Sequence, residues 1–217
     1  RPCPREPHEP GDGRRLTDSA IEATFQTLTK YKRLAESHAV DEIIATATSA
    51  VREAENGADF VATVRRDIGI RVRIISGNEE ARLIHGAAAY PAGVGGRPSV
   101  VIDIGGGSVE ITRGVGPTLD MGRSFKVGVI RLMERYVKSD PISPRDGRKL
   151  ARHVEEETGA YLDQIVKAGF DRVIGTSGTI LSLGTMAAHE MLGDTPDEIR
   201  NLKIPAKQIR RIREKAT

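Results

Sequence analysis

The chain has 217 residues, of which 38% are hydrophobic and 4% aromatic, enough for a soluble α/β core of one large or two small domains. Its net charge of +3 is too small to indicate nucleic-acid binding, and its aromatic residues are too few for base-stacking platforms. The single cysteine, Cys3, excludes an internal disulfide, and no apolar run is long enough for a membrane span or a signal peptide. We therefore expect a cytoplasmic protein that binds neither nucleic acid nor a membrane.

The first half of the chain alternates between helical and strand patterns. A proline-rich, irregular leader over residues 1–15 precedes a helix that Thr17 caps and whose apolar residues recur every three or four positions. The elements expected after it are a buried strand over 41–49, a short helix over 49–57 ended by Asn56-Gly57, a helix over 58–69, a strand over 70–76 and a helix over 77–90. This alternation predicts an α/β architecture.

The helix expected over 77–90 carries two adjacent glutamates in its first turn. Ser76 and Glu79 have the spacing of a capping box, which gives Glu79 a structural role. Glu80 has no such role, and it lies where a helix leaves the end of a strand, a place where α/β folds build their sites. Glu80 is therefore a catalytic candidate, although a glutamate in a first turn is also favoured by the helix dipole alone.

Residues 99–114, "SVVIDIGGGSVEITRG", have the pattern of a β-hairpin. A two-residue turn at Gly106-Gly107 would pair residues whose numbers sum to 213, because glycine tolerates the positive φ angles of such turns. Apolar residues then fill one face, while Asp103 lies opposite Glu110 on the other. Two facing carboxylates repel each other, so this register predicts a cation between them or a proton on one of them.

The turn of this hairpin offers a row of backbone amides without side chains, which suits a phosphate. Residues 105–108, "GGGS", lack the lysine of a P-loop, and a turn between strands differs from a strand-to-helix loop. The sequence leaves open a simpler alternative, in which this is an ordinary glycine-rich hairpin and both acids face water.

The second half of the chain continues with strand and helix patterns. The elements expected are a third antiparallel strand over 117–128, helices over 129–137 and 144–168, a strand that changes into a helix within residues 170–192, and a basic helix over 205–217 that forms a solvated face. The strand-to-helix change falls at "GTSGT", where Thr176, Ser177 and Gly178 begin a helix. A helix N-terminus favours an anion, and simple N-capping by Thr176 or Ser177 is the alternative.

Five segments together resemble one protein family. They are "ATATSAVREAENG", "IISGNEEARLIHGAAA", "VIDIGGGSVEI", "SFKVGVIRLMERY" and "GTSGTI". In this order and spacing they resemble the Ppx/GppA family, the exopolyphosphatases and guanosine pentaphosphate phosphohydrolases of the actin-like ATPase superfamily. The resemblance implies a two-domain ribonuclease-H-like fold, Mg²⁺ as cofactor, and hydrolysis of terminal phosphoanhydrides in inorganic polyphosphate or pppGpp. It also makes a homodimer an expectation.

The resemblance assigns roles to individual residues of this chain. Glu80 matches the glutamate that activates the attacking water, and Asp103 and Glu110 match acids associated with the magnesium. Arg52 matches an arginine near the phosphate chain. The second phosphate loop matches Gly105, Gly106, Gly107 and Ser108.

The chain also departs from the family pattern. Nothing like the first phosphate loop, a strand and turn of the type "IDIGSNS", precedes residue 14, and the closing strand and helices are not found before Thr217. We therefore expect a partial fold, with residues 1–95 as part of a first ribonuclease-H-like domain and 96–217 as a truncated second one. Two alternatives to an active hydrolase stay open: an inactive module that binds phosphate or an alarmone, and a kinase of the same superfamily.

Overall fold

A computed structural model describes residues 15–89, 96–193 and 201–216 of the chain. The predicted leader and the predicted break after Pro91 lie outside these residues, apart from their last positions. The chain divides into two compact units, Arg1–Ser76 and Gly77–Thr217. Among the described residues, no helix combines the length and the apolar character needed to cross a membrane.

The first unit contains three helices and two strands in its described part. They are α1 (Asp18–Ser37), β1 (Ala45–Ala47), α2 (Ser49–Glu53), α3 (Gly57–Asp67) and β2 (Val72–Ile74). The Thr17 hydroxyl caps α1 as predicted, accepting a hydrogen bond from the Ala20 amide at 3.2 Å. Phe60, Val64 and Ile68 are buried against the apolar side of α1, where Phe25 meets Phe60 edge to face.

The strand predicted over 41–49 is shorter and less buried than expected. Only Ala45–Ala47 is extended, pairing in parallel with Val72–Ile74, and Ile44 before it is 82% exposed. Each strand has three residues, and all three pairs of the ladder are formed. The apolar run within residues 41–49 correctly predicted a strand but wrongly predicted that the strand is buried.

The position of Asn56-Gly57 was also predicted wrongly. Helix α2 ends at Glu53, and Asn56 stands immediately before α3 instead of closing α2. The Asn56 side chain pairs with the backbone of Leu16, accepting from its amide at 2.8 Å and donating to its carbonyl at 3.0 Å. The two residues are 40 positions apart in sequence, so this contact connects the start of α3 to the start of α1.

The second unit is a four-stranded sheet with helices on both faces. Its elements are α4 (Gly77–Ala89), β3 (Pro98–Ile104), β4 (Val109–Val115), β5 (Thr118–Phe125), α5 (Val129–Tyr136), α6 (Pro144–Ala168), β6 (Arg172–Thr176), α7 (Ser177–Leu192) and α8 (Ala206–Ala216). The strand order is β5-β4-β3-β6, with β3, β4 and β5 antiparallel and β6 parallel to β3. A mixed sheet with helices on both faces confirms the predicted α/β class.

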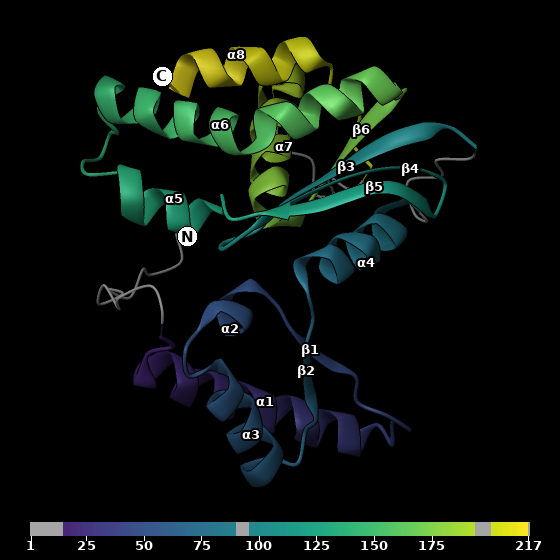
Figure 1. Ribbon diagram of the computed structural model, residues 1–217, viewed down its shortest axis with the longest axis vertical. Coiled ribbons are helices and arrows are strands. Elements are labelled where there is room, and N and C mark those ends of the chain that lie inside the picture. Colours follow the sequence, from purple (N-terminus) through teal and green to yellow (C-terminus); the bar gives the residue numbers. More distant parts are fainter. Residues whose placement is uncertain (1–14, 90–95, 194–200, 217) are drawn as a thin grey trace. The chain divides into compact units, whose positions relative to one another are not determined.

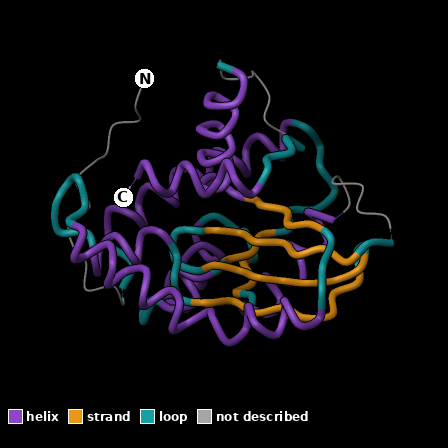
Figure 2. The backbone as a smooth tube through the Cα atoms, turned by 90° about the horizontal axis from the view of Figure 1, so that it is seen from above, coloured by secondary structure: helices purple, strands orange, loops and turns teal. Residues whose placement is uncertain are grey.

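The two faces of this sheet differ in chemistry, and each is covered by different helices. The even-numbered residues of β3 and the odd-numbered residues of β4 are apolar near the turn, and they form a core with Phe125 of β5 and with Tyr161 and Ile165 of α6. The opposite face carries Asp103 and Glu110, and α4 packs across β4 and β5 on that side. Figure 1 shows α6 and α4 on opposite sides of the sheet, and Figure 2 shows the four strands side by side.

The packing of α4 explains why the compact units divide elsewhere than predicted. The sequence placed the domain boundary between residues 95 and 96, at the glycine-rich break, whereas the units divide between Ser76 and Gly77. Helix α4 contacts β3, β4 and β5, so it belongs to the same compact unit as the sheet that follows it in sequence. Glu80 and the hairpin acids therefore lie in one unit.

The basic helix predicted at the end of the chain is α8, and only one of its sides is solvated. Ile212 and Gln208 are buried, and the Gln208 amide donates to Glu190 of α7 at 2.6 Å. Lys215 forms an ion pair with the other oxygen of the same carboxylate. One face of α8 thus packs against α7 while its arginines cover the outside.

Candidate active site

Asp103 and Glu110 face each other across the β3–β4 hairpin, as the predicted register requires. The hairpin pairs Ile104 with Val109, Asp103 with Glu110, and Ile102 with Ile111. Partners in an antiparallel ladder project from the same side of the sheet, so the two carboxylates share the face that α4 covers. The simpler alternative, with both acids in water, is wrong for Glu110, which is only 2% exposed.

The Glu110 carboxyl lies among groups that set its charge. The Ser124 hydroxyl of β5 donates to its Oε1 at 2.6 Å. Burial raises the pKa of Glu110, hydrogen bonds from Ser124 and Ser108 lower it, and the negative charges of Glu80 and Asp103 raise it further. Glu80 and Asp103 therefore each lie within electrostatic reach of Glu110.

Helix α4 brings Glu80 to this group because His85 holds the helix against the sheet. The His85 ring is fully buried, with Nδ1 at 2.8 Å from the Thr112 hydroxyl and Nε2 at 3.2 Å from the Gly116 carbonyl. Burial lowers the pKa of His85, which favours the neutral ring. Since a carbonyl can only accept, Nε2 carries the hydrogen and Nδ1 accepts from Thr112.

The start of α7 meets the carboxylates at the same edge of the sheet. Strands β3 and β6 run in parallel, and Asp103 pairs with Thr176 where both strands end. The Thr176 hydroxyl donates to Asp103 Oδ2 at 2.5 Å and makes no capping bond, so its side chain orients an acid instead of capping a helix. Ser177 has a left-handed φ of 73°, and its hydroxyl donates to the Ile104 carbonyl at 2.7 Å. The predicted helix start at Thr176 and Ser177 is confirmed, and anion binding there stays a prediction.

The glycine turn presents fewer amides than predicted. The Gly105 amide donates to the Ser108 carbonyl at 3.0 Å, so it closes the turn and is not available for a phosphate. In the described part of the chain, the backbone amides of Gly106, Gly107 and Ser108 donate to no protein group. These three amides are the groups that could bind an anion.

Arg52 was predicted to lie near the phosphate chain. It lies in α2 of the first unit, and its Nη1 donates to the Ile75 carbonyl at 2.9 Å. Its predicted contact with a phosphate chain stays a prediction.

The donor set suits magnesium better than a metal that needs a full protein cage. Within the residues that the structure describes, no group of three or more histidine, cysteine or acidic side chains has a metal-binding arrangement. Magnesium keeps several waters and is usually bound through one or two carboxylates together with substrate phosphates. Asp103 and Glu110 fit that pattern, and magnesium there stays a proposal.

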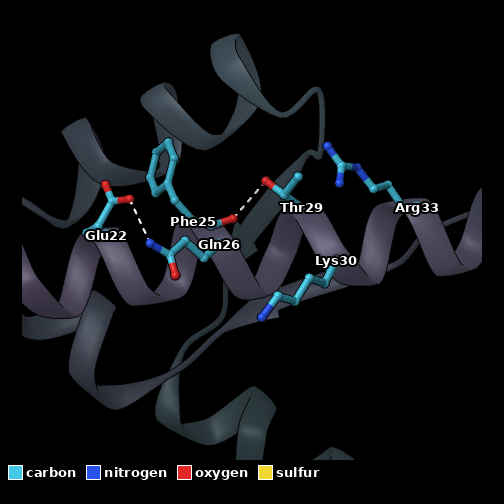
Figure 3. A pocket seen from close by; sticks show the side chains of 6 residues that line it. All are labelled: Glu22, Phe25, Gln26, Thr29, Lys30 and Arg33. Carbon is cyan, nitrogen blue, oxygen red and sulfur yellow. Dashed lines mark hydrogen bonds between the residues drawn. The ribbon is translucent and has the colours of Figure 1, made fainter.

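The first unit has a separate, open hollow along α1. Figure 3 shows the residues that line it: Glu22, Phe25, Gln26, Thr29, Lys30 and Arg33. The polar bonds within it are local, from Gln26 to Glu22 and from the Thr29 hydroxyl to the Phe25 carbonyl. None of the lining residues is one of the three candidate carboxylates. All of them belong to α1, and their arrangement does not indicate a catalytic or binding site.

Sequence reasoning did not predict that Ser124 and the residues at the start of α5 contact the site. Strand β5 was expected, but its register was not, and that register places Ser124 opposite Glu110. Gly128 and Arg131, at the start of α5, contact the backbone of the glycine turn. The predicted register of the hairpin and the predicted third strand were the signals that could have placed Ser124 opposite Glu110.

Comparison with known proteins identifies the family. The profile of the Ppx/GppA phosphatase family matches residues 9–217. The chain belongs to the Ppx/GppA phosphatase family. Among similar proteins, exopolyphosphatase 1 of Mycobacterium leprae is 31% identical over 173 residues, 79% of this chain and 51% of the relative. Exopolyphosphatase 1 of Mycobacterium tuberculosis H37Rv is 31% identical over 182 residues, 82% and 53% of the two chains.

Solved structures of Ppx/GppA proteins share this fold. A family member from Aquifex aeolicus has a TM-score of 0.73 at 28% identity, covering 94% of this chain and 64% of the other. An exopolyphosphatase from Cytophaga hutchinsonii has a TM-score of 0.79 at 27% identity, covering 93% and 65%. The fold predicted from the resemblance is thus confirmed. This Ppx/GppA chain spans about half the length of the curated relatives it matches.

Proposed function

We propose that this chain carries the catalytic acids of a phosphohydrolase that releases phosphate from the end of inorganic polyphosphate or converts pppGpp to ppGpp. The observation that supports it most directly is the pairing of Asp103 with Glu110 beside a turn with three available amides, with Glu80 of α4 close enough to act on the charge of Glu110. The similar Mycobacterium proteins are exopolyphosphatases.

In the proposed reaction, a water oxygen attacks the terminal phosphorus and the bond from that phosphorus to the bridging oxygen breaks. Glu80 takes the proton that the water loses, and the shortened chain leaves with the bridging oxygen. The amides of Gly106, Gly107 and Ser108 hold the terminal phosphate, while the Thr176 hydroxyl and the Ser124 hydroxyl keep Asp103 and Glu110 in place. A magnesium ion held by Asp103 and Glu110 would supply positive charge to the phosphate oxygens.

Three further expectations belong to the same proposal. The choice between polyphosphate and pppGpp is open because both present a terminal phosphoanhydride to the same groups. A cytoplasmic location is expected from the composition and a homodimer from the resemblance, and sedimentation velocity of the purified chain is the direct measurement of its oligomeric state.

The test is phosphate release by the purified chain with polyphosphate and with pppGpp, in magnesium, for the wild type and two variants. Glu80→Gln should lower the rate at least about 10²-fold, because the general base is lost while the shape of the side chain is kept. Glu79→Gln is the matched control and should lower the unfolding free energy by no more than about 1 kcal/mol without loss of turnover.

The possible results separate the alternatives. Turnover that survives Glu80→Gln and is lost in Glu79→Gln would show that the two acids have each other's roles. Binding of polyphosphate without phosphate release would identify an inactive binding module. Transfer of phosphate to an acceptor other than water would identify a kinase, and absence of both binding and release would overturn the proposal.

A further inference from the structure

The start of helix α5 binds the carbonyl side of the glycine turn. The Val129 amide donates to the Gly105 carbonyl at 3.0 Å, and the Ile130 amide donates to the Gly106 carbonyl at 2.9 Å. The Gly107 carbonyl accepts from the Gly128 amide at 3.4 Å and from Arg131 Nε at 3.1 Å. All three carbonyls of the turn glycines are therefore held by one helix.

These carbonyls belong to the same peptide groups as the three available amides. The carbonyl of each turn glycine shares a planar peptide with the amide of the next residue, which gives the amides of Gly106, Gly107 and Ser108. In a trans peptide the N–H points away from the C=O. Contacts that direct the carbonyls toward α5 must direct these amides away from it, toward the side where an anion can approach.

The start of α5 packs closely against the backbone of the glycine turn. A Cβ atom on Gly128 would lie 2.4 Å from the Gly106 carbonyl oxygen, and one on Gly106 would lie 2.9 Å from Ile130 Cδ1. The approach at Gly128 depends on glycine, because an added atom there would meet backbone, whereas the end of the Ile130 side chain could move. The turn dipoles also continue the dipole of α5, because their negative carbonyl ends meet its positive N-terminus.

We propose that Arg131 is a positioning residue that fixes the amide-bearing side of the glycine turn for a phosphate, without touching the phosphate itself. This proposal rests on the proposed function. The guanidinium cannot lose its charge, and a cationic donor on a carbonyl polarises the whole peptide, so the Ser108 amide becomes a stronger donor. Arg131 thereby acts on the anion through the peptide between Gly107 and Ser108.

The test compares Arg131→Gln with Arg135→Gln. Arg135 is exposed, lies one turn further along α5 and stacks on Tyr136, so both variants lose the same charge from the same helix. The first measurement, without ligand, is the ¹⁵N–¹H shift and the hydrogen exchange of Gly106, Gly107 and Ser108. The second is the affinity for tripolyphosphate by titration calorimetry, and thermal melts confirm that each variant is folded.

We expect Arg131→Gln to shift the three amides, to speed their exchange, and to weaken tripolyphosphate binding about tenfold. Arg135→Gln should leave the three amides unchanged and weaken binding less than about threefold. Arg131→Lys should restore part of the affinity, and it serves as the folded variant if Arg131→Gln does not fold. Unmoved amides in Arg131→Gln, or equal losses in the two glutamine variants, would overturn the inference. Failure of the wild type to bind tripolyphosphate would count against the proposed function, while the amide measurements without ligand would still decide the role of Arg131.

Discussion

Glu110 is a buried carboxyl whose surroundings favour its neutral form. Removal from water is the largest cause that raises its pKa, the negative charges of Glu80 and Asp103 also raise it, and the hydrogen bonds from Ser124 and Ser108 offset only part of the rise. The folded state therefore holds this proton more tightly than the unfolded state does. The resulting stability is fully present below the unfolded pKa of about 4.5 and is lost as the pH rises through the folded pKa.

The first prediction is that Glu110→Gln stabilises the chain at neutral pH. The amide keeps an acceptor for the Ser124 hydroxyl but carries no charge in a buried position. We expect the melting temperature at pH 7.5 to rise by about 2–4 °C, and to change little at pH 4. Differential scanning calorimetry at both pH values measures it, with Glu134→Gln on exposed α5 surface as the control. A variant that melts below the wild type at pH 7.5 would show that the ionised carboxylate is well compensated.

Among single residues, the sequence could place the acids but not the partners that hold them. Asp103 and Glu110 were predicted to face each other because a two-residue turn fixes the pairing by arithmetic. The hydroxyl of Thr176 could not be assigned to Asp103, since that contact joins residues 73 apart in sequence. The Gly105 amide was assigned to a phosphate because its partner inside the turn depends on the turn's conformation.

Helix α4 connects the chemistry of the site to the packing of the sheet. Its His85 bonds to Thr112 of β4 and to Gly116 in the β4–β5 turn, and Glu80 lies on the same helix. Gly114 of β4 makes this packing possible, because a Cβ atom there would lie 2.5 Å from His85 Nε2 and 2.1 Å from the Thr118 carbonyl oxygen. The histidine and the glycine thus determine how closely α4 approaches the sheet.

The second prediction contrasts two glycine-to-alanine changes at this packing. Gly114→Ala should lower the unfolding free energy by more than about 2 kcal/mol, because the new methyl group meets backbone and a buried ring. Gly86→Ala should raise it by about 0.5–1 kcal/mol, because Gly86 lies inside α4 with no atom within 4 Å of the added methyl. Urea denaturation of both variants measures the two signs. Equal effects would mean that α4 does not pack as described.

The type of an element was predictable where the apolar pattern was long. The boundary of an element was not predictable where a contact with a distant residue decides it. The helices at Asp18–Ser37 and Pro144–Ala168 have caps and sustained periodicity. The end of α2 was misplaced because Asn56 looks like a helix terminator in sequence, whereas its side chain binds Leu16. The binding of α5 to the glycine turn joins two elements through backbone groups, which leave no pattern in the sequence.

At the scale of the whole chain, the candidate site is concentrated in one compact unit. Glu80, the hairpin acids, the glycine turn and the start of α7 all fall within Gly77–Thr217, and Arg52 alone falls outside it. The predicted boundary at the glycine-rich break would have separated Glu80 from the other two acids. The two divisions differ because composition marks breaks in the chain, while packing decides which side of a break a helix joins.

The third prediction follows from this concentration: a fragment of residues 77–217 should fold cooperatively and keep the two acids that are proposed to hold magnesium. We expect a single melting transition, and a rise in melting temperature of a few degrees in 10 mM magnesium, because a ligand that binds only the folded state stabilises it. The matched control is the same fragment with Asp103→Asn and Glu110→Gln, whose melting temperature should not respond to magnesium. A fragment that does not melt cooperatively would show that residues 1–76 are needed for the fold of the sheet.

The short connection between β3 and β4, residues 105–108, has a consequence for how this chain can vary. Surface loops usually accept insertions at small cost, because closure entropy grows slowly with length. Here one added residue would shift the pairing by one and exchange the two faces of β4. Glu110 would then enter the apolar layer beside Phe125 and Tyr161, and Ile111 would turn toward α4. The turn is therefore expected to tolerate changes of residue type more readily than a change of length, and a length variant among its relatives would need a compensating bulge elsewhere in the hairpin.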